Sequence, residues 1–468
     1  MQLNDTHDAA PSQNAAPSQN LAGTGQTSRH DLRKQLGAAV LTVLGATNHA
    51  LADSTTNLDS AVLHYQENAG RVAVNEAVVH VTNSDEDGSA IGVRLTYDTL
   101  SGGSPNGALP SKSVQTFARP SGSSLVSTTT TTPVQTYTTP SGKLVTEGGD
   151  TTTSGPYTVA PGKLPLDKSF HDERIAVGVD WNQPLTRLTN LALGGNVSHE
   201  TDFDSVSGNA TLASDFDERN TTLSAGFNVE SDWVRPIGGA PVPLSDYALF
   251  EKTGNRTKRV YGALLGISQV MTRRWITQLN ASLDKSSGYQ NDPYKILSAL
   301  DSDGNTIGYV YENRPSDRTR KSLYWGNKFA FDHDTLSFSF RHMSDDWGIR
   351  SNTAQVAYRW TFSHDYYLEP QYRYYHQTAA DFFHFYLLQG APLVPYASAD
   401  PRLADFTGKT LGLKFGAALD KTTEFSARVQ YYAQTGNGPS VVLPNLQGLD
   451  LYPGLKAYMV EIGFKAQL

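Results

Sequence analysis

Apolar and polar residues alternate along many short segments of this chain, from about residue 57 to residue 468. The last segment is the clearest, because Tyr458, Val460, Ile462 and Phe464 alternate with more polar residues up to Leu468. Side chains of an extended strand point to opposite faces in turn, so the pattern predicts strands with one apolar and one polar face. Further segments of this kind are 91–97, 223–229, 336–340, 356–362, 411–417 and 425–431.

The connections between these strands alternate between short and long. The short ones lie near 217–220, 271–274, 332–334, 363–365 and 420–422, and the long ones near 101–170, 232–257, 287–319, 385–408 and 437–454. All short turns then fall on one side and all long loops on the other. A soluble sandwich has no reason to show this sidedness, whereas a membrane barrel is built this way.

The pattern therefore predicts an all-β fold, a transmembrane antiparallel up-and-down β-barrel of the outer-membrane type, over residues 53–468. We expect about sixteen strands if residues 57–67 form the first strand. Fourteen is the alternative, because 57–82 is the least regular stretch. The long loops are expected outside the cell, and the connection 101–170, rich in Thr, Pro, Gly and Ser, either stays flexible there or folds into the mouth.

The final strand resembles the last strand of bacterial outer-membrane barrels, which carries the pattern polar-x-Gly-x-x-apolar-x-apolar. Here Glu461, Gly463, Ala466 and Leu468 take these positions, with Leu where an aromatic residue is commoner. The resemblance implies recognition by the outer-membrane barrel assembly machinery. The residues expected to carry this assembly signal are Tyr458, Glu461, Gly463, Phe464 and Leu468.

Composition narrows the class further. A mean hydropathy of -0.41 and the lack of any apolar run near twenty residues exclude a polytopic helical membrane protein. The chain has no Cys, which excludes disulfide and thiolate chemistry and suits export through an oxidising periplasm. The 23 Tyr residues suit aromatic girdles, and we expect the aromatic run from Tyr366 to Tyr386 to face lipid or the interfaces.

The amino end predicts export. Basic residues at 29, 33 and 34 precede the apolar stretch 36–45, and Ala50-Leu51-Ala52 has the small-x-small form of a cleavage site. We expect a signal peptide over 29–52 with cleavage after Ala52. Residues 1–28 repeat Ala-Ala-Pro-Ser-Gln-Asn and are expected to form a disordered polar extension, either a long leader or the product of an early start codon.

The strand faces opposite the apolar ones would line a lumen. This phase predicts basic residues inside, at Arg94, Lys328, Arg341, Arg359, Arg373, Lys414, Arg428 and Lys465, joined by Glu369, Glu424 and Glu461. Most other acids of a chain with net charge -8 are then expected in turns and loops. A basic lumen favours anions, so a passive pore or ligand-specific channel for a small anionic solute is predicted.

Two alternatives to that interpretation stay open. The lumen could be tiled by pairs along one strand, such as Arg373 with Glu369 or Arg428 with Glu424. The barrel could also be a non-conducting one that docks a periplasmic or surface partner.

The connection before the strand that starts near residue 320 carries a second candidate site. Apolar segments flank Asp301-Ser-Asp-Gly304 as in a hairpin, and the spacing does not fit an EF-hand calcium loop. Glu312, Arg314 and Arg318 follow it. They are expected either to form a salt-bridged latch at the mouth or to begin an ordinary strand.

Enzyme motifs are lacking. The sequence has no Gly-x-Ser-x-Gly, no His-Glu-x-x-His and no phosphate-binding loop, so no catalytic residue, cofactor or metal is expected. His171 and the pair His199-Glu200 are the remaining candidates for acid-base chemistry at the rim. The basic residues are spread over the strands, which gives no support for nucleic-acid binding.

Several stretches together are similar to those of a family of bacterial outer-membrane proteins grouped under a domain of unknown function. They are 97–108, 312–318, 345–349, 368–383 and 398–403. The resemblance spans nearly the whole mature chain. It implies a barrel in contact with the outer-membrane lipid bilayer, and it implies no reaction and no ligand.

Overall fold

The structure is a computed structural model that describes residues 54–119, 156–168, 170–452 and 454–468, together with the backbone of 128–131, 135–138, 144–147 and 151–154. The expected polar extension at 1–28, the signal peptide at 29–52 and its cleavage after Ala52 lie outside the described residues.

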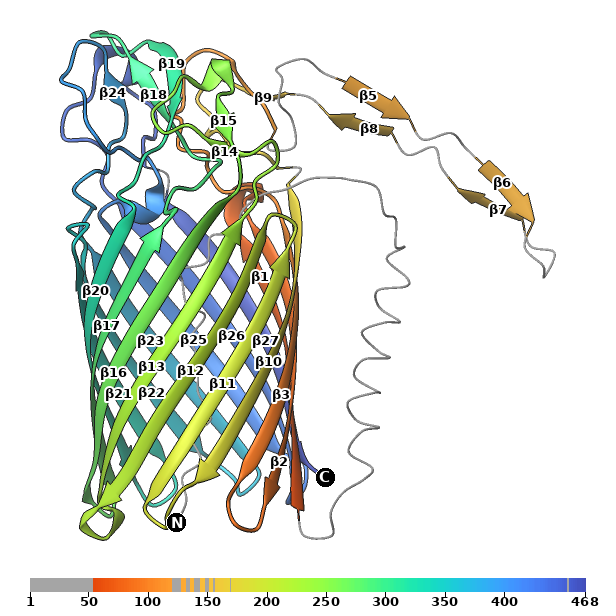
Figure 1. Ribbon diagram of the computed structural model, residues 1–468, viewed down its shortest axis with the longest axis vertical. Coiled ribbons are helices and arrows are strands. Elements are labelled where there is room, and N and C mark those ends of the chain that lie inside the picture. Colours follow the sequence, from red (N-terminus) through yellow and green to blue (C-terminus); the bar gives the residue numbers. More distant parts are fainter. Residues whose placement is uncertain are drawn as a thin grey trace.

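A closed barrel of sixteen antiparallel strands forms the frame (Figure 1). The strands, in order around the barrel, are β1 (Ser54–Glu67), β2 (Ala73–Asp85), β3 (Ala90–Ser101), β10 (His171–Pro184), β11 (Thr189–Glu200), β12 (Phe203–Phe216), β13 (Thr221–Val234), β16 (Arg256–Thr272), β17 (Trp275–Gly288), β20 (Asp317–Ala330), β21 (Thr335–Asp345), β22 (Arg350–Thr361), β23 (Tyr366–Gln377), β25 (Phe406–Ala418), β26 (Thr423–Gly436) and β27 (Leu455–Gln467). The predicted fold class is confirmed with sixteen strands. The alternative of fourteen is wrong, because the irregular stretch 57–82 supplies β1 and most of β2.

The barrel closes where β1 pairs with β27. The ladder runs from Asn57 opposite Gln467 to Glu67 opposite Ala457, and the Leu468 amide donates to the Thr56 carbonyl at 2.8 Å beyond it. Closure pairs every strand on both sides and leaves no sheet edge. Among the described residues, no helix is both long and apolar enough for a membrane span.

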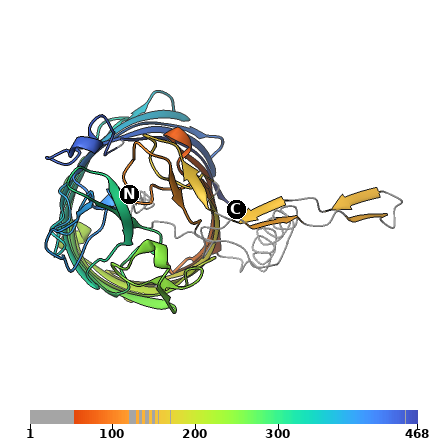
Figure 2. The ribbon, with the colours of Figure 1, turned by 90° about the horizontal axis from the view of Figure 1, so that it is seen from above.

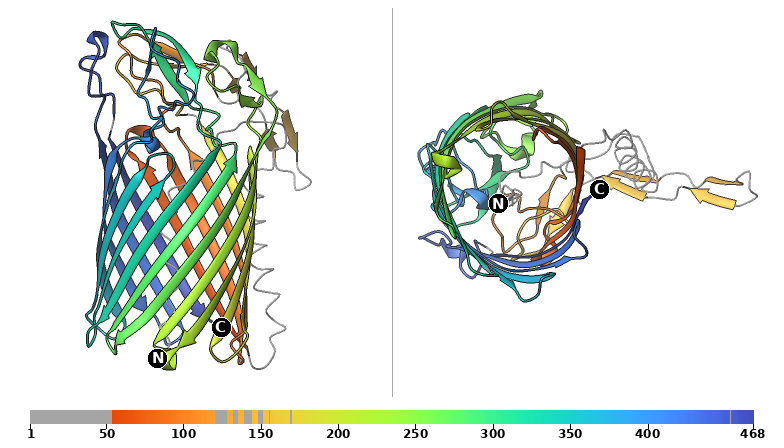
Figure 3. Two further views of the ribbon diagram at one scale, coloured as in Figure 1. Left: turned by 60° about the vertical axis from the view of Figure 1, so that its left-hand side comes forward. Right: turned by 90° about the horizontal axis from the view of Figure 1, so that it is seen from below.

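The two ends of the barrel differ in their connections (Figures 1 and 3). At one end, here called the turn end, tight connections span 86–89, 185–188, 217–220, 273–274, 331–334, 362–365 and 419–422. At the other, the loop end, connections span 68–72, 102–170, 201–202, 235–255, 289–316, 346–349, 378–405 and 437–454. Every long connection therefore leaves from the loop end.

One loop boundary differs from the prediction. The connection before β25 starts at 378 rather than 385. Gln377 is the last paired residue of β23, and its side chain donates to the Arg402 and Ala404 carbonyls of the connection at 2.9 and 2.8 Å. Phe382 and the aromatic residues that follow it pack inside the loops, so the expectation that this part of the run faces lipid is wrong. On β23 itself, Tyr366, Tyr372 and Tyr374 face outward, while Tyr367 and Tyr375 face the lumen.

The outer surface of the barrel is apolar. Outward side chains such as Val62, Leu265 and Leu411 have exposed fractions of 58%, 67% and 62%. A water-soluble protein rarely exposes so much contiguous apolar surface, whereas a lipid-facing barrel wall must. At the turn end, Trp360, Phe362, Tyr366 and Phe415 stack in a row with ring centroids 5.5 to 6.2 Å apart, as an interfacial aromatic girdle does.

The loop-end connections form a packed layer of their own. It contains the sheet of β18 (Ile296–Leu300), β19 (Thr306–Tyr311) and β24 (Leu387–Leu388), and the pairs of β4 (Gln115–Phe117) with β9 (Tyr157–Val159) and of β14 (Ala240–Pro241) with β15 (Lys252–Thr253). The expected hairpin around Asp301 is confirmed, since β18 and β19 flank it. The backbone of β5 (Thr128–Thr131) pairs with that of β8 (Thr151–Ser154), and β6 (Gln135–Thr138) pairs with β7 (Leu144–Glu147).

Short 3-10 turns complete the structure: η2 (Asn68–Gly70), η3 (Asp217–Arg219), η4 (Tyr247–Leu249), η5 (Pro401–Leu403) and η6 (Pro444–Leu446). The largest fully buried apolar side chains, Phe117, Ile296, Leu297 and Leu300, all belong to the loop layer. Seen from above, ribbons of this layer lie within the outline of the barrel (Figure 2). The apolar core of the molecule is therefore at the mouth, and the barrel interior is left to polar side chains.

Candidate functional site

The alternation of strand side chains decides which residues line the lumen. On β21 the Phe340 ring is outward, so Arg341 is inward, and on β26 Val429 is outward next to inward Arg428. The same reasoning places on the inner face all eight basic residues singled out from the sequence: Arg94, Lys328, Arg341, Arg359, Arg373, Lys414, Arg428 and Lys465. Their role in selectivity stays a prediction.

The charged pairs on β22 to β27 join neighbouring strands. Arg359 Nε donates to Glu369 Oε2 at 2.8 Å, and Arg428 Nη1 lies 3.6 Å from Glu461 Oε2. The expected pairs along one strand, Arg373 with Glu369 and Arg428 with Glu424, are therefore wrong. Residues four apart on a strand are separated by about 13 Å, whereas residues opposite each other on neighbouring strands are adjacent.

Most of the basic residues gather on one side of the lumen. We call the inner face of β20 to β26 the basic arc; its bases are Arg318, Arg320, Lys328, Arg341, Arg359, Arg373, Lys414 and Arg428, and its acids are Asp345, Glu369 and Glu424. Two of these acids are held within the arc, Asp345 by Arg318 and Glu369 by Arg359. The basic arc thus carries a surplus of positive charge.

The opposite side of the lumen is acidic, which the sequence analysis missed. We call the inner face of β1 to β17 the acidic arc; its acids include Asp59, Glu76, Asp98, Asp180, Asp215, Glu230, Asp232 and Asp284, and its bases are Arg94, Arg174, Arg256 and Lys258. Turns and loops do hold more of the described acids than the barrel strands, as expected, but the acids of this arc were not anticipated. The same phase that located the bases, applied to Asp and Glu, would have located these acids.

Contacts within the acidic arc are short. Arg174 Nε donates to Asp98 Oδ2 at 2.6 Å and Arg174 Nη2 lies 3.7 Å from Glu76 Oε2, so one guanidinium serves two carboxylates. Across the same wall, His80 Nε2 lies 2.9 Å from Asp180 Oδ1. This arc thus keeps a surplus of negative charge.

A second charged group holds the loop layer together. We call Asp292, Lys295, Glu312, Arg314, Asp400 and Arg402 the mouth cluster. Arg314 donates to Glu312 at 2.9 Å and to Asp400 at 2.8 Å, and Arg402 donates to Asp292 at 2.8 Å and to Asp400. Lys295 Nζ donates to Ser104 Oγ at 2.8 Å and to the Pro105 carbonyl. The cluster thereby ties together the connections 102–170, 289–316 and 378–405.

The expected latch is formed only in part. Glu312 and Arg314 meet, but Arg318 lies elsewhere: it donates to Asp345 through Nε at 2.8 Å and Nη2 at 2.6 Å, and its guanidinium lies 4.4 Å from the centre of the Trp347 ring. Arg318 is already on β20, and it fastens this strand to the connection 346–349. Asp400 takes its place in the cluster, a partner that no local pattern in the sequence could indicate.

Burial and neighbouring charges set the protonation of the mouth cluster. Burial alone would raise the pKa of Asp400, but Arg402, Arg314 and Lys295 outweigh it and hold its pKa far below the usual range. Burial raises the pKa of Glu312 in spite of Arg314 beside it. Burial likewise lowers the pKa of Lys295 although three carboxylates lie near it. Apart from Arg402, which is 43% exposed, the members of the cluster are charges held largely away from water, where pairing is obligatory.

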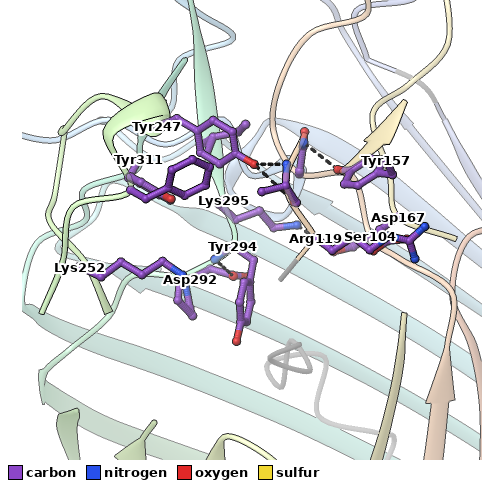
Figure 4. Close-up of a pocket in the computed structure, with 15 residues that line it drawn as sticks. Ser104, Arg119, Tyr157, Asp167, Tyr247, Lys252, Asp292, Tyr294, Lys295 and Tyr311 are labelled. Carbon is purple, nitrogen blue, oxygen red and sulfur yellow. Dashed lines mark hydrogen bonds between the residues drawn. The ribbon is translucent and has the colours of Figure 1, made fainter. Parts of the chain in front are cut away.

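A cavity of about 50 Å³ lies beside Lys295 within the loop layer (Figure 4). Tyr157, Tyr247 and Tyr294 line it, and burial raises the pKa of all three hydroxyls. Sites for small organic ligands occupy about 300 Å³ or more, so this cavity has room for a few water molecules only. The lumen is therefore the better candidate for a solute site.

Comparison with known proteins identifies the family. Residues 33–466 match the family model described as "Protein of unknown function (DUF3570)". The chain belongs to this family. None of the curated proteins matches the sequence.

Solved structures similar to this DUF3570 barrel include outer-membrane proteins of two bacteria. OccK5 (OpdH) of Pseudomonas aeruginosa is 7% identical, with 89% of this chain and 99% of that one covered, at a TM-score of 0.38. OpdK of Pseudomonas aeruginosa with vanillate is 9% identical, with 89% and 100% covered, at 0.38. The siderophore receptor PirA of Acinetobacter baumannii is 8% identical at 0.39, and this chain spans only 55% of it. These likenesses concern the barrel fold alone.

The rim histidines of the DUF3570 barrel each lie beside a carboxylate. His199 points outward and its Nδ1 lies 2.5 Å from Asp204 Oδ1, whereas Glu200, the next residue on β11, points inward. His199 and Glu200 therefore cannot act as an acid-base pair. His171 Nε2 lies 3.1 Å from Glu173 Oε1 on an exposed face. Glu200 instead lies near Asp172 and Asp202, with carboxylate oxygens within 4.8 Å of one another, and Tyr294 donates to Asp202 at 2.7 Å.

The residues of the expected assembly signal all lie on or next to β27. The outward face carries Tyr458, Phe464 and Leu468, while Glu461 and Gly463 face the lumen. The Tyr458 ring packs against Tyr431 of β26 at 5.1 Å. These positions are consistent with recognition of β27 by the assembly machinery through its outward-facing side chains. That this strand carries the assembly signal stays a prediction.

Proposed function

We propose that this protein is a channel of the bacterial outer membrane through which small charged solutes diffuse. The observation that carries the proposal is a sixteen-stranded barrel with an apolar outer face and an inner face of charged side chains. Barrels of this size are wide enough to leave an aqueous channel. Charged side chains on the inner face also favour a water-filled interior, because burying them in an apolar core would be costly. The row of Trp360, Phe362 and Tyr366 supports a position in a bilayer.

The basic arc is proposed to favour anionic solutes. Arg341 lies over the Tyr324 ring at 5.5 Å, and no salt bridge within the described chain holds either Arg341 or Arg373. Fixed positive charges on a wall of low dielectric attract anions more strongly than the same charges in bulk water. The outer-membrane barrel assembly machinery is proposed to insert the chain through β27.

Conductance of the refolded barrel in a planar bilayer under a salt gradient tests the proposal. We expect stepwise openings, and we expect Arg341→Gln with Arg373→Gln to shift the reversal potential towards cation preference. Arg274→Gln is the control, because Arg274 is 63% exposed at the turn end and pairs with Asp332. A folded, heat-modifiable barrel that never conducts would overturn the channel and favour a barrel that docks a partner. An unchanged reversal potential in the double variant would overturn the role of the basic arc alone.

A further inference from the structure

We propose that the lumen selects dipolar solutes, small molecules that carry an anionic and a cationic group, by orienting them between the basic arc and the acidic arc. This inference rests on the proposed channel function and specifies which class of solute the channel prefers.

Charges of opposite sign face each other across the barrel. In a closed ring of sixteen strands, each strand faces the one eight positions away, so β21 faces β3 and β20 faces β2. Arg341 of β21 is therefore opposite Asp98 of β3, and Arg320 of β20 is opposite Glu76 of β2.

These side chains also lie at similar depth. Arg341, Arg373 and Glu230 are each four residues from the loop end of their strands, and Arg320, Glu76 and Asp98 are each three. A strand rises about 3.3 Å per residue, so the six side chains form one belt below the loop layer. Asp284 stands opposite Arg320 in the ladder between β17 and β20, and this contact marks one border between the arcs.

The ion pairs within each arc do not cancel the difference in net charge between the two arcs. On the acidic arc, Arg174 is shared between Glu76 and Asp98, so its single charge offsets only one of the two. On the basic arc, the carboxylate of Asp345 is fully buried against Arg318, and Glu369 belongs to Arg359 near the turn end. The belt therefore has a net positive and a net negative side.

Such a belt produces a field directed across the lumen. The field is strong because low-dielectric walls concentrate it. A dipolar solute that turns its carboxylate to Arg341 and Arg373 and its ammonium group to Glu230 and Asp98 gains at both ends. A solute with one charge gains at one wall only, and a neutral solute of equal size gains nothing.

Swelling of liposomes that contain the refolded, full barrel tests this selection. The probes are β-alanine, which is dipolar at neutral pH, and lactamide, which is neutral and has the same mass. We expect β-alanine to enter at least about threefold faster than lactamide. Arg341→Gln with Arg373→Gln, and separately Glu230→Gln with Asp98→Asn, should each bring this ratio close to one and leave the lactamide rate unchanged. Arg274→Gln serves again as the control.

The outcomes separate the two proposals. If neither solute enters the wild-type liposomes, the channel itself is refuted. If both enter at equal rates, the channel stands and the dipolar selection is refuted. If the ratio depends on one arc only, the lumen selects a single charge and the inference is again overturned. Equal wild-type rates refute the dipolar selection whether or not a variant inserts. Lactamide entry shows which variants do insert.

Discussion

Arg314 donates a hydrogen bond to Asp400 across 2.8 Å, and both side chains are almost fully buried although they belong to different loop-end connections. Removing one partner of a buried pair leaves a charge without compensation and costs about 3–5 kcal/mol. Arg314→Met should therefore release the loop layer while the barrel stays closed. Limited proteolysis of the folded protein should show rapid cleavage within 289–316 and 378–405.

The control for that variant is Arg274→Met. Arg274 pairs with Asp332 at 2.5 Å, but both side chains are mostly exposed, and such pairs contribute about 0–1 kcal/mol. Equal resistance of the two variants to protease would show that the mouth cluster does not hold the loops.

The burial of Lys295 predicts a pH dependence of the loop layer. Its pKa in the folded protein lies below the ordinary 10.5, so between the two values the unfolded loops bind more protons than the folded ones. Stability of the layer should then rise with pH across this window, up to about pH 10.5. Lys295→Met should abolish this rise.

The measurement is the temperature at which the loops become sensitive to protease, for both proteins, between pH 7 and pH 10. The difference between wild type and variant isolates Lys295 from the tyrosines, whose hydroxyls titrate higher. Parallel curves for the two proteins would contradict the prediction.

The two faces of a strand should respond differently to the same substitution. Leu413 faces outward and is 49% exposed, while Gln430 of the next strand faces inward. An Arg on the lipid face near the middle of the bilayer costs about 2–4 kcal/mol, whereas the lumen accepts it. Leu413→Arg should lower the urea midpoint of unfolding in lipid vesicles, and Gln430→Arg should leave it almost unchanged. Equal effects would refute the assignment of lipid and lumen faces.

Gly416 makes room for the ring of Tyr367. A Cβ at Gly416 would lie 2.0 Å from Tyr367 Cε1. This ring also lies under the Arg359 guanidinium, and the Tyr367 hydroxyl donates to Glu424 Oε1 at 2.9 Å. Gly416→Ala should destabilise the barrel by about 1–3 kcal/mol because the ring has to move. Gly195→Ala is the matched control, since the nearest atom to its Cβ is 3.8 Å away. Urea unfolding monitored by heat-modifiability compares the two variants, and equal midpoints would count against the close fit.

The alternation of residues predicted most of the barrel because strand faces are a local property. Val93 and Arg94, or Phe340 and Arg341, already differ in polarity in the sequence, and the structure places each pair on opposite faces. The acidic arc was equally accessible to this reasoning, but among the acids it was applied to Glu369, Glu424 and Glu461 only.

The loop layer could not be predicted in the same way, because its contacts join distant segments. Arg314 meets Asp400, which is 86 residues away, and Lys295 meets Ser104, which is 191 residues away. The aromatic residues after Gln377 continue the apparent strand pattern, and only the packing of Phe382 against Trp347 at 5.0 Å shows that they left the barrel. An alternation of apolar and polar residues does not show whether the apolar ones face lipid or are buried against another loop.

The ladder between β1 and β27 also constrains how the barrel folds. Ser60 and Phe464, which share a hydrogen bond there, are 404 residues apart in the chain. Contacts at such separation make folding slow, and until β27 is present the sheet has two unpaired edges that can join other chains. The barrel can close only once β27 is present, and until then the open sheet needs protection from aggregation.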